Sequence, residues 1–433
     1  MHYDIVFLYD KRTRYSLNAL IASIDLISGI KIQLMEDFNE ILDYATSIVN
    51  KNEKCIVALS LLTTTIAQDD YYLKLKEFIR NAKKIGCITI CGGPHATGDP
   101  LGCLMYFGFD YVFIGEAEES IRDFIIALRD GGDILSVKGI AYLDQDQDVV
   151  FTGRRSPIDL NTYDPFPYWR NIVNPIEITR GCPYGCFYCQ VSYIHGFRYR
   201  HRNPDKIVFY AEQILRRGIK DIRFISPDGL AYGLSDISRE VKIDEIEQLL
   251  YTLSQVAAKY SGRIFLGSFP SEVRPEHVSE EAVRVLKKYV SNRSLIIGAQ
   301  SGSERILNVI NRRHSVEDVL VAVETATRHG FIPDVDLIIG FPGETVEEMW
   351  ETVNLAKKIT KLGGRIHLHY YLPLPGSPFC MKPPSIVPGE VKKELARIIG
   401  AGKGYGDWLK QEELSWKIIE LHRNNVIKPR RWS

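Results

Sequence analysis

The sequence predicts an α/β protein with two domains, and two observations carry this prediction. Short apolar runs alternate with longer amphipathic stretches over residues 1–138, and the same alternation resumes over residues 175–380. This is the pattern of parallel βαβ units. Residues 139–174 carry a predicted hairpin and then a proline- and aromatic-rich stretch without a period, which indicates a linker. We therefore expect a Rossmann-like domain, a linker, a partial (β/α)6 barrel and a short helical C-terminal extension over residues 381–433.

The first domain should be a mostly parallel sheet covered by helices. We expect strands at residues 3–10, 55–62, 87–93 and 111–116, and helices at residues 16–28, 71–86 and 119–132. Gly86, Gly131 and Gly132 are suitable residues to end the second and third of these helices. Each strand leads into a polar or glycine-rich loop. In a parallel sheet such loops gather at the carboxyl ends of the strands, where they form a ligand crevice.

The second domain should contain six strands, each followed by a helix or by a final loop. The strand segments are residues 175–181, 221–229, 263–271, 294–302, 334–344 and 365–378. The intervening helical segments are residues 206–218, 243–260, 279–289, 316–330 and 346–359. A complete barrel needs eight strands, so a partial barrel fits better. The extension that follows should close the barrel or contact a partner.

Composition and charge exclude several classes of protein. Of the 433 residues, 45% are hydrophobic and 25% are charged, and the formal net charge is zero. Zero net charge argues against a protein that mainly binds nucleic acid non-specifically. No apolar run approaches the ~18 residues that span a bilayer, and no basic segment with an apolar stretch opens the chain. We expect a cytoplasmic protein whose eight cysteines stay reduced.

Three of these cysteines lie within eight residues, in the segment GCPYGCFYCQ. Cys182, Cys186 and Cys189 follow a predicted barrel strand with the spacing C-x3-C-x2-C. Structural zinc normally takes four ligands in two distant pairs, and His195 is the only further candidate nearby. Thiolates at such short spacings hold iron–sulfur clusters. A cubane with three protein ligands leaves one iron open to bind another molecule.

This loop at the end of a first barrel strand resembles the radical S-adenosylmethionine (SAM) superfamily. Residues 298–318, 336–345 and 371–378 are also similar to stretches that recur in that superfamily. The resemblance implies a [4Fe-4S] cluster on the three cysteines, SAM on the open iron and an external low-potential electron donor. It also implies that the aromatic residue before the last cysteine, Tyr188, lies near the adenine. By their positions at strand ends, the other expected SAM contacts are Asp228, Ser268, Glu272, Arg274 and Gln300.

The strand ends of the first domain resemble those of the cobalamin-binding domain that precedes many radical SAM barrels. The residues that carry this resemblance, and that we expect to contact cobalamin, are Ser60, Thr63, Thr64, Gly92, Gly93, Pro94, His95, Gly115 and Glu116. The string Asp-x-His-x-x-Gly, which supplies a histidine ligand to cobalt, is absent. His95 is therefore expected to contact a loop or the cofactor's tail. The alternative is a domain that kept its shape and lost the cofactor.

One arginine-rich segment, HGFRYRHR at residues 195–202, follows the cysteine loop. It would suit a phosphate or a nucleic acid. Because the chain has no net charge, we favour a segment that docks the upstream domain or shields the cluster. Nucleic acid is therefore disfavoured as a partner, and RNA stays open as a substrate beside a lipid, a peptide and a cofactor precursor.

The resemblance as a whole implies a cobalamin-dependent methyltransferase that acts on an unactivated carbon through a 5′-deoxyadenosyl radical. Two alternatives stay open: a non-methylating radical reaction, such as rearrangement or methylthiolation, and a non-enzymatic iron–sulfur or corrinoid sensor. A methylthiotransferase should carry a second set of cysteines in its first domain. Cys55, Cys87, Cys91 and Cys103 are available, but their positions in or beside strands fit poorly. The sequence does not identify the substrate.

Overall fold

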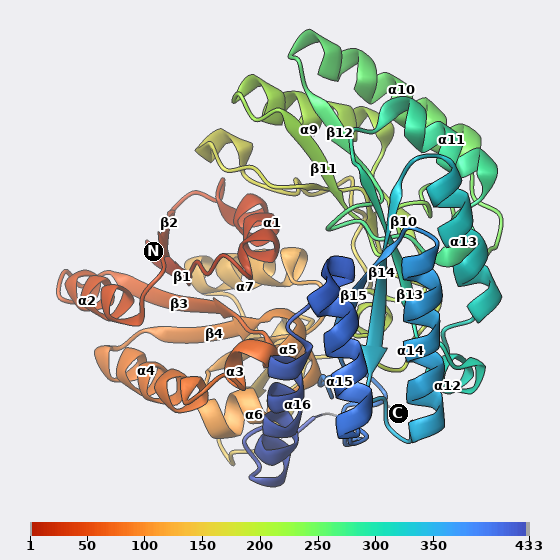
Figure 1. The fold of residues 1–433 in the computed structure, drawn as a ribbon. Coiled ribbons are helices and arrows are strands. Elements are labelled where there is room, and N and C mark those ends of the chain that lie inside the picture. The colour runs from red at the N-terminus through yellow and green to blue at the C-terminus, as the bar shows by residue number, and fades with distance from the viewer. Residues whose placement is uncertain (1, 430–433) are drawn as a thin grey trace.

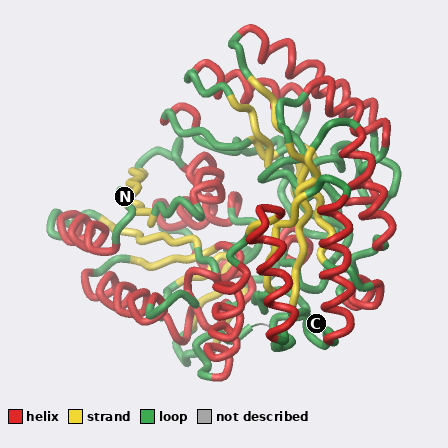
Figure 2. The backbone as a smooth tube through the Cα atoms, viewed as in Figure 1, coloured by secondary structure: helices red, strands yellow, loops and turns green. Residues whose placement is uncertain are grey.

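The computed structural model describes residues 2–429, which form two α/β units (Figure 1). Figure 2 shows the strands as two separate groups with helices around each. The first unit is a seven-stranded sheet in the order β2-β1-β3-β4-β5-β6-β7. Its parallel strands are β1 (Tyr3–Leu8), β2 (Ile30–Met35), β3 (Lys54–Ser60), β4 (Ile88–Gly92) and β5 (Tyr111–Phe113).

Helices cover both faces of this sheet. Two separate hydrophobic cores lie on its two sides. One face carries α1 (Arg14–Ile24) and α7 (Glu118–Asp130), and the other carries α2 (Phe38–Val49) and α4 (Tyr71–Ile85). As the sequence predicts, α4 and α7 end at Gly86 and Gly131, whose φ angles of 104° and 72° favour glycine. The structure adds β2 and α2, which the sequence analysis does not assign.

The predicted hairpin lies at the edge of the first sheet. Strands β6 (Ile140–Leu143) and β7 (Val149–Phe151) pair antiparallel with each other, and β6 pairs antiparallel with β5. The hairpin that we assign to the linker thus extends the sheet of the first unit. The segment without long regular elements runs from residue 152 to residue 175.

The second unit is the partial barrel. Its six main strands run parallel: β8 (Ile176–Glu177), β11 (Asp221–Ile225), β12 (Arg263–Phe265), β13 (Ser294–Gln300), β14 (Ile332–Ile339) and β15 (Arg365–Tyr370). A single bridge between Val273 and Ile297 joins the β8–β12 strands to the β13–β15 strands. The outer helices are α9 (Pro204–Arg216), α10 (Ile243–Lys259), α11 (Glu280–Tyr289), α13 (Val316–Arg328) and α14 (Val346–Lys361).

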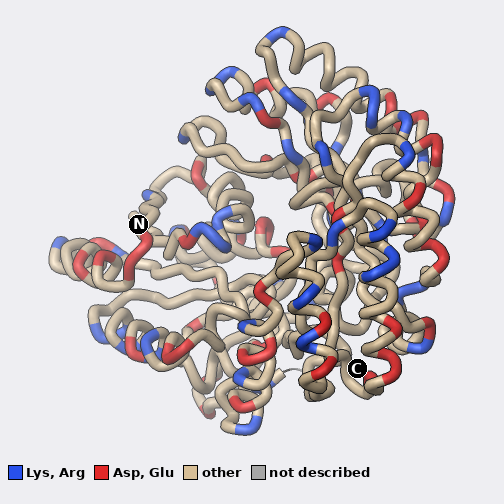
Figure 3. Tube along the Cα trace, in the orientation of Figure 1, with Lys and Arg blue, Asp and Glu red and all other residues tan. Residues whose placement is uncertain are grey.

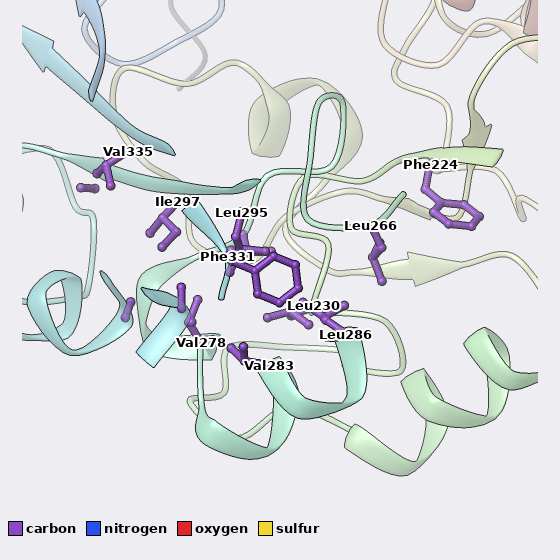
Figure 4. Close-up of a cluster of buried hydrophobic side chains, with 14 of the residues drawn as sticks. Phe224, Leu230, Leu266, Val278, Val283, Leu286, Leu295, Ile297, Phe331 and Val335 are labelled. Carbon is purple, nitrogen blue, oxygen red and sulfur yellow. The ribbon is translucent and has the colours of Figure 1, made fainter. Parts of the chain in front are cut away.

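Apolar side chains from strands and outer helices meet in one large core. Figure 4 shows Leu266, Leu295 and Phe331 close to Val283 and Leu286 of α11. Three of the outer helices, α11, α13 and α14, begin where a side chain accepts from a free N–H group. Ser315 and Thr345 form capping boxes at the starts of α13 and α14. Figure 3 shows positively and negatively charged residues interspersed along the outer helices in this view.

The C-terminal extension joins the two units. Helix α15 (Gly389–Ile398) packs against α14, and the short strand β16 (Gly404–Tyr405) pairs with β15. Helix α16 (Trp408–Arg423) contacts β15, while Ile418 and Leu421 lie in a core of the first unit. The extension therefore closes the barrel and ties it to the first sheet; residues 430–433 lie outside the described part. Within residues 2–429, no helix is both long and apolar enough to cross a membrane.

Candidate active site

The loop with the three cysteines lies at the mouth of the barrel. It follows β9 (Thr179–Arg180) and leads into α8 (Val191–His195). Residues from beyond β13 hold it in place. The Asn311 side-chain amide donates to the carbonyls of Tyr184 and Gly185 at 2.8 and 3.1 Å, and the Phe187 N–H donates to the Ile310 carbonyl at 3.0 Å. The loop conformation is thus fixed by the barrel.

The three thiols suit a cluster better than a single ion. All are free and lie on one cavity wall, but their sulfur atoms do not all fall within 4.8 Å of one another. That triangle is too wide for one zinc ion with bonds of about 2.3 Å. Burial, together with the neighbouring Cys186, raises the pKa of Cys189 to about 12. This thiol therefore needs a bound metal to ionise at neutral pH.

Hydrogen-bond donors surround the sulfurs. The Arg312 guanidinium lies 3.8 Å from Cys186 Sγ, and the Val191 N–H points at Cys189 Sγ from 3.5 Å. Arg312 is held by the Gly298 carbonyl at 2.6 Å and by His314 Nε2 at 3.1 Å. Such donors stabilise negative charge on thiolates. The residues present therefore fit an iron–sulfur cluster.

A cavity of about 440 Å³ opens beside the thiols. Four of the six side chains expected near SAM line it: Tyr188, Glu272, Arg274 and Gln300. Gln300 ends β13 in the left-handed region, with a φ of 77°, at a bulge in the ladder to β14. That bulge turns its amide toward the cavity. A non-glycine residue in this region is uncommon and marks a site where a ligand is expected.

The other two expected SAM contacts do not line this cavity. Asp228 is 1% exposed, and its carboxylate accepts from His277 Nδ1 at 2.6 Å and from the Leu230 N–H at 3.1 Å. Ser268 is also buried, and its carbonyl accepts from the Ser271 N–H and hydroxyl at 2.8 and 2.9 Å. Asp228 therefore stabilises the loop that follows its strand, because its carboxylate is engaged there, whereas the buried Ser268 hydroxyl has no hydrogen-bond partner among the described residues.

The cavity is lined by side chains of both charges. Arg274 lies 3.4 Å from the centroid of the Tyr184 ring and pairs with Glu276 at 2.6 Å, beside Arg312. Glu272 and Asp336 also line the cavity. Burial and the neighbouring Asp336 raise the pKa of Glu272 to about 7. Glu272 can thus exchange a proton near neutral pH.

A second cavity, of about 290 Å³, lies between the first sheet and the barrel. Five of the nine residues expected at cobalamin line it: Ser60, Gly93, Pro94, Gly115 and Glu116. Gly93 has a φ of 90°, and a Cβ there would lie 2.7 Å from Ser60 Oγ. The chain can cross so close to β3 only with glycine at this position. This glycine cradle at the strand ends fits a flat cofactor that approaches the backbone.

Three of the remaining four point elsewhere. His95 is fully buried, its Nδ1 lies 2.9 Å from the Thr63 hydroxyl, and its Nε2 faces Asp99. Burial lowers the pKa of His95 to about 3, so it stays neutral. His95 and Thr63 are therefore buried in the first unit and do not line this cavity. Thr64 lines a different cavity, against α16, and Gly92 is the last residue of β4.

The segment at residues 195–202 docks the two units, as the sequence analysis favours. Arg200 and His195 both bind the carboxylate of Glu116, the histidine at 3.2 Å, and Arg180 approaches it at 3.7 Å. Arg202 donates to backbone carbonyls, including that of Tyr163 at 2.9 Å. Although burial opposes it, these cations lower the pKa of Glu116 to about 2. The Glu116 carboxylate is thus ionised in the interface.

Sequence reasoning missed several residues of the first cavity, including Arg312, Asp336, His369 and Gln411. Arg312 and Asp336 lie in the two recurring stretches 298–318 and 336–345, which were the available signal. His369 comes from the strand segment 365–378, and Gln411 comes from the C-terminal extension.

The fold and the site define an enzyme class in which an iron–sulfur barrel faces a ligand-binding parallel sheet. Residues 176–356 match the model of the radical SAM superfamily, and residues 15–125 match that of the B12 binding domain. The chain therefore carries a radical SAM domain and, before it, a B12-binding domain. These domains imply a [4Fe-4S] cluster, SAM and cobalamin as its cofactors.

Known proteins with similar sequences or folds include three of particular interest. The uncharacterized protein MJ1620 of Methanocaldococcus jannaschii is 26% identical over 79% of this chain and 74% of its own length. A probable threonylcarbamoyladenosine tRNA methylthiotransferase of Archaeoglobus fulgidus is 30% identical over 52% of this chain, which spans about half (51%) of that protein. The radical SAM methyltransferase TsrM of Kitasatospora setae, solved with cobalamin and a [4Fe-4S] cluster, shares the fold with a TM-score of 0.68. Its identity is 16%, over 88% of this chain and 74% of TsrM.

Proposed function

We propose that this radical SAM enzyme is a cobalamin-dependent methyltransferase that acts on an unactivated carbon. One observation carries the proposal. The cavity beside the thiols and the cavity at the first sheet share the residues Phe269 and Pro270. A group held in one cavity is therefore separated from a group held in the other by the loop that contains these two residues. Methyl transfer needs such proximity, since both cofactors must reach the same substrate atom.

The residues that would hold each group follow from the cavity walls. Cys182, Cys186 and Cys189 would hold the cluster, Tyr188, Arg274 and Gln300 would contact SAM, and Ser60, Gly93 and Gly115 would face cobalamin. When bound, the cluster supplies a low-potential electron for SAM cleavage, and cobalamin supplies methyl-group chemistry. The electron itself must come from an external low-potential donor.

The protein's own contribution is to position these groups and to keep water out. Gln190, next to the last cysteine, donates to the carbonyls of Pro94 and Pro375 at 3.3 and 2.6 Å. The cysteine loop is thus tied to the first sheet. On the other side, Tyr188 packs against Phe341 with a centroid separation of 5.6 Å. Rigid, apolar surroundings of this kind protect a reactive radical from solvent.

Methylthiolation is the second candidate, because one relative bears the name of a tRNA methylthiotransferase. That reaction would call for a second cysteine set in the first unit. There, Cys55 contacts Cys87 and Cys103 contacts Cys91, and all four are buried in one hydrophobic core. Among the described residues, no three of these four sulfurs lie within 4.8 Å of one another. These side chains favour a structural role over a second cluster.

The test is anaerobic reconstitution of the full chain with iron, sulfide and cobalamin. We expect about four irons and one corrinoid per chain, and 5′-deoxyadenosine when SAM and a strong reductant are added. Cys186→Ala should lose the iron and the deoxyadenosine, whereas Cys91→Ala, a matched buried cysteine, should keep both. Deoxyadenosine without any bound corrinoid would refute methyl transfer by cobalamin. Iron near eight per chain that falls to four in Cys91→Ala would favour methylthiolation instead.

A further inference from the structure

We propose that Asp336, His367 and His369 form a binding site for a divalent transition-metal ion inside the barrel, separate from the cluster. The three residues come from neighbouring strands, β14 and β15, in which Asp336 is directly opposite His367. His367 and His369 are two residues apart, so their side chains project from the same face of β15. The strand register therefore brings two imidazoles and a carboxylate to one point.

The three donor atoms have the spacing of a metal's ligand set. Asp336 Oδ1 lies 2.9 Å from His367 Nδ1, His367 Nδ1 lies 3.2 Å from His369 Nε2, and His369 Nε2 lies 3.8 Å from Asp336 Oδ1. Ligands on bonds of about 2.1 Å are roughly 3.0 Å apart at right angles and roughly 3.4 Å apart in a tetrahedron. The observed triangle spans these values. Two histidines and one carboxylate on a single side of a metal leave its other positions open.

The surroundings of the triangle also suit a cation. Within the described residues, the ion pairs of Asp336 are with these two histidines only, and the Glu272 carboxyl contacts its carboxylate. Arg312 offsets part of the charge on Glu272, whereas a divalent ion would balance the charge that the two histidines leave on Asp336. The ring of His367 stacks on Tyr405 of β16, with a centroid distance of 4.4 Å and an angle of 15°. The extension thus fixes the orientation of one ligand.

Asp336, His369 and Glu272 line the 440 Å³ cavity, so the open positions of the metal would face it. A metal there would bind an oxygen or nitrogen donor of the molecule that enters the cavity. The thiols are not among these three donors, and the two sites need not compete. This inference rests on the side chains alone and does not depend on methyl transfer.

The contact between Gln411 and His369 sets a condition that metal binding must meet. The Gln411 carbonyl oxygen accepts from the Tyr370 N–H at 2.8 Å, which directs its NH2 group to His369 Nδ1 at 3.3 Å. A metal on Nε2 needs a proton on Nδ1 and therefore an acceptor beside it. The Gln411 amide would have to turn when the metal binds. A glutamate would accept from both groups at once, so Gln411→Glu should bind the metal about ten-fold more tightly than the native chain.

The experiment uses the full chain with its cluster reconstituted, stripped of other metals with EDTA and then equilibrated with Zn²⁺. We expect one zinc per chain by elemental analysis after desalting, with only nitrogen and oxygen ligands near 2.0–2.1 Å in the zinc X-ray absorption spectrum. His367→Gln and His369→Gln should each lose this zinc. His329→Gln should retain it, because His329 pairs with the carboxylate of Glu280 on the outside of the barrel.

Three results would overturn the proposal: a chain that holds its iron cluster but binds no zinc, sulfur in the zinc coordination shell, or an undiminished zinc content in His367→Gln. Gln411→Glu guards against misfolding as a cause of lost binding, since it predicts a gain in affinity. A Gln411→Glu chain that folds and binds zinc no more tightly than the native chain would also count against the site. Isothermal titration with Zn²⁺ supplies these affinities.

Discussion

The ion pair network around Glu116 makes a quantitative prediction about how the two units are held together. The side chain is 3% exposed, and its carboxylate receives Arg200, His195, Arg180 and the Ile158 N–H. Its pKa falls from the ordinary 4.5 to about 2. At about 1.4 kcal/mol per pKa unit, the ionised carboxylate contributes about 3 kcal/mol to the free energy of unfolding at neutral pH. Glu116→Gln should remove a similar amount.

The sign of the pH dependence follows from the lowered pKa. The contribution is fully present above pH 4.5, and it is lost as the pH falls through the folded value of about 2. Guanidinium unfolding of the cluster-free chain at pH 7, 5 and 3 measures it. The difference between native and Glu116→Gln chains should be equal at pH 7 and 5 and roughly halved at pH 3.

A matched control is available in the same unit. Glu119 pairs with Arg155 at 2.9 Å but is 36% exposed, so Glu119→Gln should cost less than about 1 kcal/mol. A Glu116→Gln cost as small as that of Glu119→Gln would refute the argument. So would a difference that stays constant down to pH 3, because it would show that the carboxylate's charge is not what stabilises the interface.

Two further predictions concern close contacts at the site. Gly98→Ala would place a Cβ 2.2 Å from the Pro375 carbonyl group, so it should lower the free energy of unfolding by several kcal/mol in guanidinium. Gly389 has open space around it, so Gly389→Ala should change that free energy by less than about 0.5 kcal/mol. Arg312→Lys keeps the charge but loses the fork that binds the Gly298 carbonyl and faces Cys186. In a chromatographic assay, Arg312→Lys should slow deoxyadenosine formation at least about ten-fold. Arg313 is exposed, so Arg313→Lys should leave the rate unchanged. Equal rates in the two variants would contradict this role of Arg312.

Much of the fold could be predicted from the sequence, because hydrophobic periodicity reports burial directly. Both sets of βα units, the helix ends at Gly86 and Gly131 and the hairpin after β5 follow from local patterns. Strand β2 escaped notice because it is half-buried at the sheet edge and lacks a continuous apolar run. The role of the hairpin also depends on a partner strand distant in sequence. Local pattern identifies a hairpin but not the strand to which it pairs.

The candidate site was predictable where backbone position alone places a side chain. The cysteine loop and the end of β13 are of this kind. The positions of Asp228 and His95 were not predictable in this way, because a residue at a strand end can turn inward. Asp228 bonds to the buried His277, and His95 bonds to the buried Thr63. Such partners come from other elements, so only the assembled fold reveals that these side chains have buried hydrogen-bond partners.

The histidines of β15 were also not predictable as site residues from the sequence. In the sequence, His367 and His369 are two polar residues in an alternating strand, and nothing local separates a ligand from a solvated side chain. Their proposed role as metal ligands depends on the register of β14 and β15, which sets Asp336 opposite His367. A shift of that register by one residue would turn Asp336 to the other face of the sheet. Tyr405 and Gln411 then fix the two rings from a segment about 40 residues further along the chain. The C-terminal extension therefore contributes to the proposed metal site, since it supplies one contact to each imidazole.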